Sequence, residues 1–325
     1  MLCASLLLWL ALFVCYWRRP DSCAAITLWP VWAWALIGLL VTGLAWDRRA
    51  KRAVGGVALL WLLFLVVFAE EPSSLVRFGA WPDPDWVAAR QQGRGLRVVS
   101  LNCSGGSAAA AAEVARYHPD IVLLQESPSR ENVRALGRRL FGSEAGVVWG
   151  IDGSIIARGR ARQIPAPRDT SILTMTHVRL SSRIEANVIS VRLVPPEIRI
   201  DLWSPSCWRD HAANRRARRG QVAEAMKAIE GLPRSVPLIV GGDLNAPAGD
   251  AAFWPLRRRL KDTFREAGKG WGNTVLNDAP ALRFDQVWAS DDLRACAVVA
   301  RKTRHSDHRM VICDLVIRDR RKKPR

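Results

Sequence analysis

Three long apolar stretches open the chain, and a different pattern follows them. Residues 1–17, 26–46 and 53–69 contain no charged side chain, and short charged segments bound each stretch. A membrane-spanning helix needs roughly 20 apolar residues, with a range of roughly 17–25. We therefore predict three transmembrane helices and assign residues 1–69 to a membrane anchor.

The first apolar stretch has a second interpretation. A cleaved signal peptide also begins with a short apolar segment, but it carries a basic start and a small-x-small cleavage site. Residues 1–17 have no basic start, and no such site follows Trp17. Three helices are therefore favoured over a signal peptide followed by two helices.

Basic residues in the two short loops predict the orientation of the anchor. The loop after residue 46 has four (Arg48, Arg49, Lys51 and Arg52), whereas the loop after residue 17 has two. Loops rich in Lys and Arg stay on the cytoplasmic side. We therefore expect a multi-pass protein of the cell membrane whose remaining chain is extracytoplasmic.

From residue 70 the pattern changes twice. Residues 70–95 are rich in Pro, Gly and Ser and are typical of a linker. Beyond them, short apolar runs bounded by turn residues predict buried strands. The predicted strands are 96–102, 120–124, 147–149, 154–157, 172–180, 186–193, 197–203, 237–240, 286–289 and 309–316. With predicted helices at 108–117 and 221–229, they indicate a two-sheet α/β sandwich over residues 96–317, followed by a solvated basic tail at 318–325.

Acidic, amide and imidazole side chains stand where predicted strands meet loops. They are Asn102, Glu126, Asp243, Asn245, Asp285, Asp307 and His308. A buried carboxylate is costly unless it is paired or bound to a metal. Oxygen ligands of this kind suit Mg²⁺, which completes its shell with water and substrate phosphate.

The motifs that carry these residues follow a recognisable order. They are LRVVSLNCSG, DIVLLQES, DGSIIARGRA, RRGQVAEAMKAI, PLIVGGDLNAP, RFDQVWAS and HSDHRMV. This order resembles the endonuclease/exonuclease/phosphatase family, which includes DNase I-like nucleases, abasic-site exonucleases and neutral sphingomyelinases. The resemblance covers residues 96–317 and implies a four-layered α/β sandwich of the DNase I type.

The resemblance also implies a role for each residue. Glu126 would be the main ligand of Mg²⁺, or alternatively Mn²⁺, with Asn102 and Asp307 nearby. His308, oriented by Asp285, would contact the scissile phosphate or handle protons. Asp243 would position or deprotonate the attacking water, and Asn245 would hold Asp243 or the phosphate.

Two departures from the family pattern bear on activity. Many members have Asn-x-Asp after the first strand, whereas this chain has Asn102-Cys103-Ser104. Many also place His or Tyr in a strand ahead of the long helix, where Trp203 stands here. Trp203 and Arg192 are therefore predicted to bind substrate, with Ser204 and His177 as alternative donors. The departures leave open a second interpretation of the function, in which the protein is a catalytically degenerate, membrane-tethered binding module of the same fold.

The net charge of the chain favours polyanionic substrates but does not distinguish nucleic acid from an anionic lipid. The chain carries a net charge of +18, of which residues 1–96 contribute +3. Basic clusters at 209–219, 257–261 and the tail suit the phosphates of nucleic acid or of anionic lipid head groups, or simply a solvated surface. We expect a phosphodiester substrate in nucleic acid or a phospholipid head group. The sequence names no protein partner, and its cysteines predict neither a zinc site nor a catalytic thiol.

Overall fold

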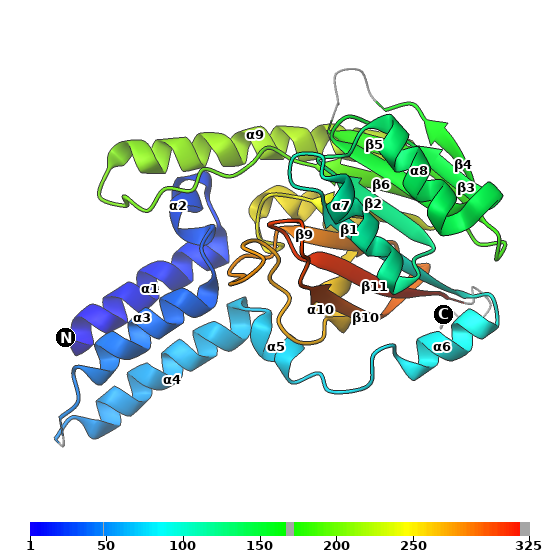
Figure 1. Ribbon diagram of the computed structural model, residues 1–325. Coiled ribbons are helices and arrows are strands. Elements are labelled where there is room, and N and C mark those ends of the chain that lie inside the picture. The colour runs from blue at the N-terminus through cyan, green and yellow to red at the C-terminus, as the bar shows by residue number, and fades with distance from the viewer. Residues whose placement is uncertain (48, 167–171, 319–325) are drawn as a thin grey trace.

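The computed structural model describes residues 1–47, 49–166 and 172–318, and Figure 1 shows their arrangement. Apart from Arg318, the predicted basic tail lies outside these residues. The strands are β1 (Gly95–Asn102), β2 (Ile121–Gln125), β3 (Ala145–Val148), β4 (Gly153–Ile164), β5 (Leu173–Leu180), β6 (Glu185–Arg192), β7 (Leu238–Asp243), β8 (Lys261–Asp262), β9 (Asp285–Ala289), β10 (Leu293–Arg301) and β11 (Met310–Ile317). The α-helices are α1 (Leu2–Arg18), α2 (Ala24–Thr27), α3 (Val31–Gly43), α4 (Lys51–Phe68), α5 (Glu71–Leu75), α6 (Pro84–Gln91), α7 (Ala108–Ala112), α8 (Arg130–Phe141), α9 (Pro205–Glu230) and α10 (Thr263–Ala267). The 3₁₀ helices are η1 (Asp21–Cys23), η2 (Glu113–Tyr117), η3 (Gly142–Glu144) and η4 (Ala251–Arg258).

A single path of strands curls into two packed halves. Its order is β10-β11-β1-β2-β4-β5-β6-β7-β9-β8, and β3 pairs with β4. The two halves share β4, which pairs with β2 and β3 over residues 153–158 and with β5 from Gly159 onward. At Gly159 the backbone φ is +138°, and an added Cβ would lie 2.3 Å from the Arg179 carbonyl oxygen. Only glycine fits this crossing point, so it lets one strand serve both halves.

The halves are held together by an apolar core and covered by helices. The central core joins side chains of β1, β2 and β4 to those of β5, β6, β7 and β9. A second core packs α9 and η4 on β5, β6, β7 and β9. A third packs α7, η2 and α8 on β1, β2 and β11. The predicted α/β sandwich is therefore confirmed, with helices outside and two sheet halves inside.

One predicted strand is wrong. Residues 197–203 form no strand; the chain leaves the sheet after Arg192 and runs irregularly to α9. Pro195 and Pro196 cannot donate to a strand ladder, which favours this exit. The predicted helix at 221–229 is the last part of the much longer α9. The strand β10 and the helix α8 were not predicted.

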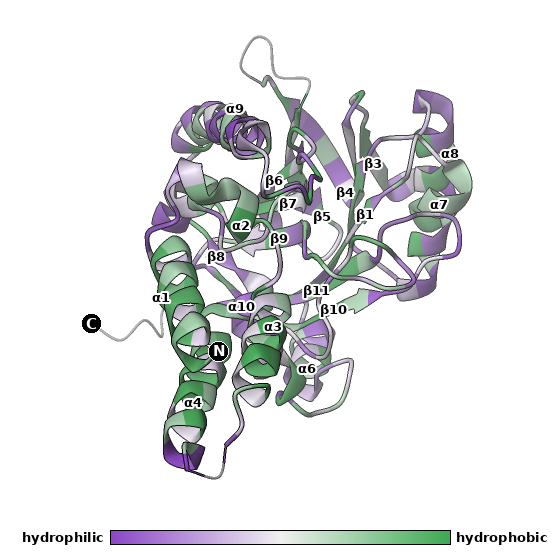
Figure 2. Cartoon of the chain, turned by 90° about the vertical axis from the view of Figure 1, so that its left-hand side faces the viewer, coloured by the Kyte–Doolittle hydropathy of each residue, from purple (hydrophilic) through white to green (hydrophobic). Residues whose placement is uncertain are grey.

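The N-terminal segment forms a bundle of apolar helices, as the colouring in Figure 2 shows. Among the described residues, only α4 is long and apolar enough to cross a membrane. A second span results only if Asp21–Thr27 and α3 are counted as one despite a bend of 73°, and α1 is shorter. Pro30 breaks the predicted second helix, because proline cannot donate an i→i−4 hydrogen bond. The prediction of three transmembrane helices is therefore not supported.

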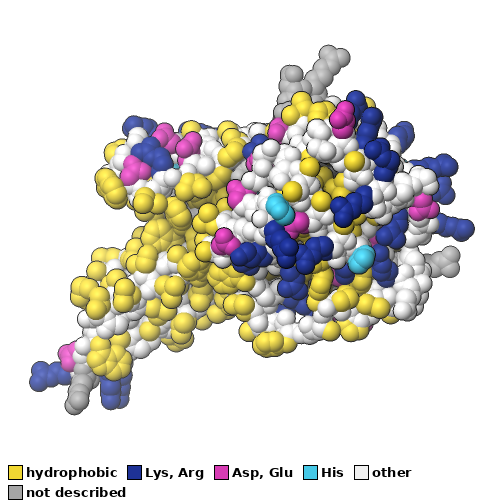
Figure 3. Space-filling model, viewed as in Figure 1, with side chains coloured by type: hydrophobic (Ala, Val, Ile, Leu, Met, Phe, Trp, Pro, Cys, Tyr) yellow, Lys and Arg dark blue, Asp and Glu magenta, His cyan; other side chains and the backbone are white. Residues whose placement is uncertain are grey.

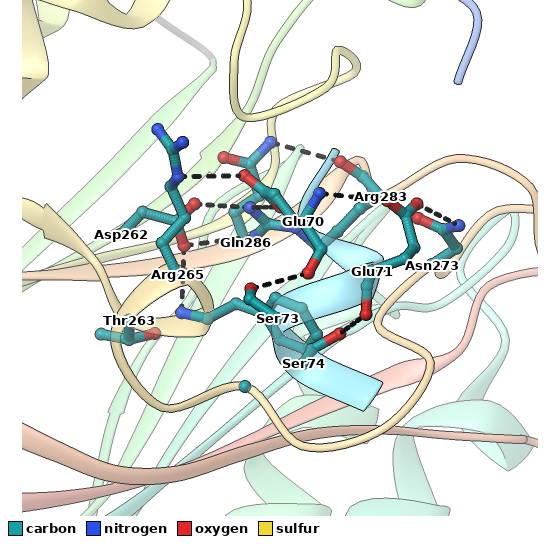
Figure 4. A network of polar contacts seen from close by, with 12 residues as sticks. Glu70, Glu71, Ser73, Ser74, Asp262, Thr263, Arg265, Asn273, Arg283 and Gln286 are labelled. Carbon is teal, nitrogen blue, oxygen red and sulfur yellow. Dashed lines mark hydrogen bonds and ion pairs between the residues drawn. The ribbon is translucent and has the colours of Figure 1, made fainter. Parts of the chain in front are cut away.

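The segment predicted as a linker, residues 70–95, is tied to the sandwich. Glu70 and Asp262 both form ion pairs with the buried Arg283, with closest distances of 2.6 and 2.5 Å. The neighbouring Glu71 accepts a hydrogen bond from Asn273 at 3.1 Å. Figure 4 shows this network, which joins the start of α5 to the loop ahead of β9. The apolar bundle and the sandwich are thus connected by buried charge pairs.

Part of the basic cluster at 209–219 also serves this connection. Arg215 is 2% exposed, forms an ion pair with Asp250 at 3.1 Å and donates to Thr27 on α2. On the same helix, Arg219 forms an ion pair with Asp21 at 2.6 Å. These two arginines hold α9 against the N-terminal segment, and their charges are paired with Asp250 and Asp21.

Candidate active site

The ends of β1, β2 and β7 and the start of β9 meet at one edge of the sandwich. Strands β1 and β2 are parallel, so Asn102 lies beside Gln125, and Glu126 follows. Strands β7 and β9 are antiparallel, and the last residue of β7, Asp243, pairs directly with the first of β9, Asp285. The strand order therefore brings together acids that are far apart along the chain.

The Asn102 amide connects two of these acids. Its Nδ2 atom donates to Glu126 Oε1 at 3.2 Å and to Asp243 Oδ2 at 3.0 Å. Its Oδ1 atom accepts from the Ser104 backbone N–H at 2.9 Å, which fixes the plane of the amide. The loop after β1 therefore holds Glu126 and Asp243 in place.

Glu126 is bound by polar groups through both carboxylate oxygens. Arg192, at the end of β6, forms an ion pair with Oε1 at 3.0 Å, and the Gly105 N–H donates to Oε2 at 2.6 Å. Partial burial would raise the pKa of this carboxyl, but the hydrogen bonds from Gly105 and Asn102 and the charge of Arg192 lower it below its usual range. Glu126 is thus an anion that remains partly open to solvent.

Asp285 and His308 form the second polar pair of the site. His308 Nδ1 lies 2.8 Å from Asp285 Oδ2, and both residues are buried. Burial alone would lower the pKa of His308, but the charge and hydrogen bond of Asp285, with smaller effects of Asp243 and Asp307, raise it to about 10. His308 is therefore an imidazolium at neutral pH, with Nδ1 directed to the carboxylate.

Asp243 has an unusual protonation equilibrium. It is 2% exposed, and burial together with the nearby charge of Asp285 raises its pKa to about 6. The backbone N–H of Asn245 donates to its Oδ1 atom at 3.0 Å. A carboxylate with this pKa is ionised at pH 7 and still accepts a proton readily.

Local backbone geometry explains the Gly-Gly-Asp-x-Asn motif. Gly242 has φ of +145°, and an added Cβ would lie 2.0 Å from the Val191 carbonyl oxygen. Asn245 and Glu126 have φ of +52° and +44°, a conformation that side chains other than glycine rarely adopt. Such conformations concentrate at functional sites, where the surrounding structure holds them.

The structure brings together most of the predicted site residues. Asn102, Glu126, Arg192, Asp243, Asn245, Asp285 and His308 are linked by the contacts above. Asp307 is exposed beside His308, and its carbonyl oxygen accepts a hydrogen bond from the Asn277 N–H at 2.8 Å.

The predicted aromatic substrate-binding position is not part of the site. Trp203 is 83% exposed, directly ahead of α9, and its chain neighbour Leu202 packs against the N-terminal bundle. The error follows from the wrong strand assignment at 197–203. Ser204 lies in the same segment, and His177 on β5 pairs with Asn187 at 3.1 Å, so neither replaces it. Arg192 is the predicted donor that the structure does place at the site.

Sequence reasoning missed two supporting groups. Ser306 Oγ donates to the Asn102 carbonyl oxygen at 2.7 Å and accepts from the His308 N–H at 3.0 Å. This hydroxyl ties the His308 loop to the end of β1. Asp152 lies 3.5 Å from Arg192, so Arg192 forms ion pairs with both Asp152 and Glu126. Both residues stand in motifs visible in the sequence, Ser306 in HSDHRMV and Asp152 at the start of DGSIIARGRA, but neither was assigned a role.

The donor set fits a hard divalent cation. The carboxylate oxygens of Asp243 and Asp285 and a ring nitrogen of His308 all lie within 4.8 Å of one another, and the two carboxylates are the metal donors of this group while His308 is protonated. Asp285 Oδ1 is buried and has no hydrogen-bond partner among the described residues, an arrangement that is costly unless another group compensates it. Glu126 and Asn102 add oxygen atoms at the same edge, and carboxylate and amide oxygens suit Mg²⁺ or Mn²⁺.

A curled α/β sandwich with acids and a histidine at its strand ends is the architecture of a class of phosphoester hydrolases. The chain belongs to the Endonuclease/Exonuclease/phosphatase family, whose model matches residues 99–308. No curated protein matches the chain.

Solved structures share the fold at low sequence identity. A family member from Bacteroides thetaiotaomicron is 14% identical with a TM-score of 0.54, covering 69% of this chain and 98% of its own. D. rerio TDP2, complexed with a single strand DNA product, is 18% identical with a TM-score of 0.51, covering 68% of this chain and 98% of its own. A mannosyl-6-phosphatase from B. thetaiotaomicron is 15% identical with a TM-score of 0.50, covering 68% of this chain and all of its own.

The Asp285 charge accounts for the protonation of His308, which a titration can test. In metal-free protein, the pKa of His308 is expected near 10 and should fall toward the ordinary 6.5 in Asp285→Asn, because burial then acts with less opposition. NMR of the labelled His308 imidazole over roughly pH 5–11 measures this pKa in each variant. Asp278→Asn, an exposed acid paired with Lys302, is the control. An unchanged pKa in Asp285→Asn would contradict the assignment.

Proposed function

We propose that this protein is a metal-dependent phosphodiesterase attached to a membrane. The observation that carries the catalytic part is the direct pairing of Asp243 with the Asp285–His308 pair at the edge that also holds Glu126 and Asn102. The family relationship supports a hydrolase that acts on phosphoester bonds.

Each residue of the cluster has a task in such a reaction. Asp243 accepts the proton of the attacking water, because its pKa of about 6 keeps it ionised and basic at neutral pH. His308 presents its Nε2–H and its positive charge to a phosphate oxygen, while Asp285 fixes the ring. Arg192, 25% exposed in its side chain, adds a second cation for the phosphate. Asn245 keeps Asp243 oriented.

The metal would be held by Glu126 and Asn102, with Asp307 exposed nearby. When bound, a divalent cation neutralises charge on the phosphoryl oxygens and orients the substrate. Glu126 is suited to this ligand role, since it is ionised and partly open to solvent.

A phosphodiester in nucleic acid or in a phospholipid head group is the proposed substrate. One structural neighbour binds a DNA product and another is named a phosphatase, so the fold itself does not decide. The binding-module alternative is kept as an outcome of the test below.

Activity should depend on the metal and on the cluster. The purified full-length chain in detergent is assayed with Mg²⁺, Mn²⁺ or EDTA on plasmid DNA, sphingomyelin, phosphoinositides and bis-p-nitrophenyl phosphate. Asp243→Asn and His308→Ala remove the base and the phosphate contact, so each should lower turnover by about 10²–10⁴-fold. EDTA should abolish it.

His305→Ala is the matched control, since this exposed histidine pairs with Glu113 outside the cluster. It should leave turnover unchanged. Equal turnover of wild type, Asp243→Asn and His308→Ala would refute the site. Metal binding without turnover on any substrate would support the binding module.

Membrane attachment is proposed from the exposed faces of the bundle. Only 22% of the apolar window of α4 is buried, so most of its side chains point outward. Leu59, Leu62, Val66 and other large apolar residues are about half exposed or more. Figure 3 shows that such side chains cover the bundle surface. Contiguous apolar surface of this kind marks a membrane or protein interaction.

The basic loop lies at the tip of the bundle, away from the sandwich. Arg49, Lys51 and Arg52 stand at this tip, where Figure 3 shows basic side chains. Because basic loops favour the cytoplasm, the sandwich is proposed to be extracytoplasmic.

A reporter experiment tests this orientation. Alkaline phosphatase, active only outside the cytoplasm, is fused after residue 318, and a fluorescent protein active in the cytoplasm is fused in parallel. Phosphatase activity with little fluorescence is expected. The matched variant replaces Arg49, Lys51 and Arg52 with Gln, which should reduce the phosphatase signal. Fluorescence alone in the wild type would contradict the proposed orientation.

A further inference from the structure

A cavity of about 290 Å³ lies where the bundle meets the sandwich. The end of α1, the start of α3 and the end of α4 contribute to it, together with loops that follow β7 and precede β9. The three helix ends all face the sandwich, as Figure 1 shows. The cavity therefore sits at the level where the apolar bundle gives way to the polar domain.

One part of the cavity lining is rich in arginine. Arg19, Arg257, Arg265 and Arg283 line it, against Glu70 and Glu71 as the acids. Arg283 is neutralised by Glu70 and Asp262, and Arg265 lies 3.6 Å from Glu70. The lining thus carries more positive than negative charge.

Two of these arginines form no ion pair with a carboxylate among the described residues, although Asp250 acts on Arg19, and Asp262 and Glu70 act on Arg257, from a greater distance. Arg19 donates from Nε to the Tyr16 carbonyl oxygen at 3.0 Å, and no carboxylate of the described residues forms an ion pair with it. Arg257 has neither a hydrogen bond nor an ion pair within the described part of the chain. Guanidinium groups bind phosphate oxygens through pairs of N–H groups. Because Arg19 and Arg257 form no ion pair among the described residues, both side chains are available to an anion.

The Arg19 guanidinium lies close to Gly249 of the sandwich, where the absence of a side chain leaves space for it. An added Cβ at Gly249 would lie 2.5 Å from Arg19 Nη1. Gly249 follows the Asp243–Asn245 loop, so the same loop that supplies the catalytic carboxylate also seats the Arg19 guanidinium. A side chain at position 249 would displace that group.

The remainder of the lining is apolar and aromatic. Trp17, Trp29, Val67, Phe68 and Trp254 contribute to it. Trp17 is 62% exposed, and Val67 is 55% exposed on the outer surface of α4. Tryptophan at the ends of apolar helices is typical of the membrane–water interface. The cavity thus combines cations with a path to the apolar helix surface.

We propose that this cavity binds the phosphate of an anionic phospholipid, with Arg19 and Arg257 as its ligands and the acyl chains along the outer surfaces of α1 and α4. A free phosphate would use the cations but not the apolar lining. The inference rests on the membrane attachment proposed above and is independent of catalysis. It assigns the lipid a site distinct from the Asp243–His308 cluster.

Binding is measured by calorimetry on the full-length chain in detergent with EDTA and the His308→Ala change, so that no lipid is hydrolysed. The probes are dihexanoyl phosphatidylglycerol and inorganic phosphate. The lipid should bind saturably and at least about tenfold more tightly than phosphate, because it adds apolar contacts. Equal affinity for the two probes, or no saturable binding, would overturn the proposal.

Two pairs of variants locate the binding site. Arg257→Ala should weaken lipid binding by about tenfold or more, whereas Arg258→Ala, its exposed neighbour outside the lining, should not. Gly249→Ala should weaken it by displacing Arg19, whereas Gly220→Ala, with open space around its position, should not. Equal effects within each pair would show that general surface charge or stability is responsible, against the proposal.

Flotation with phosphatidylglycerol vesicles separates the two proposals. A chain that floats but does not bind the short-chain lipid would contradict only the proposed lipid site in the cavity. A chain that binds it saturably but does not float would contradict only the attachment.

Discussion

Two buried carboxylates, Asp243 and Asp285, lie opposite each other on β7 and β9, and the rest of the site compensates their charge. Two like charges in a dry environment are unfavourable unless cations or hydrogen-bond donors approach them. His308 supplies the cation for Asp285, while the Asn102 amide and the Asn245 N–H donate to Asp243. The raised pKa values of Asp243 and His308 are two consequences of this one arrangement.

Compensation of buried charge also connects the candidate active site with the bundle. Arg283 precedes Asp285 by two residues, and Glu70 at the end of the apolar segment is one of its two acidic partners. Phe284, between them, packs with Leu28 of the N-terminal segment. The strand that begins with Asp285 is therefore held from the side of the bundle. Glu70 shares the charge of the buried Arg283 with Asp262, so the bundle contributes part of the charge compensation beside this strand.

The sequence was sufficient where local pattern and motif determine structure. Short apolar runs ended by Asn102 and Asp243 predicted both the strands and the site, because residues at neighbouring strand ends meet at one edge. The error at Trp203 arose because an apolar run can be irregular when Pro195 and Pro196 prevent pairing. The bend at Pro30 similarly divided a stretch that hydropathy alone predicted as continuous. The contacts of Arg215 with Thr27 and of Glu70 with Arg283 could not be predicted, because each joins segments more than 100 residues apart in the sequence.

The departures from the family pattern also look different in three dimensions. The contact of position 104 with the site is made by its backbone N–H, which donates to the Asn102 amide that holds Glu126 and Asp243, and does not depend on the side chain there. The missing His or Tyr is not replaced by Trp203, and Arg192 is the additional cation at the site. The proposed chemistry of this edge therefore rests on Glu126, Asp243, Asp285 and His308.

Manganese binding to the metal-free chain, followed by electron paramagnetic resonance, tests this account most directly. We expect saturable binding to the wild type that is lost in Glu126→Gln and retained in Glu113→Gln, since Glu113 is a partly buried acid outside the cluster that accepts hydrogen bonds from the backbone of Arg304 and His305. Equal binding by the wild type and Glu126→Gln would contradict it.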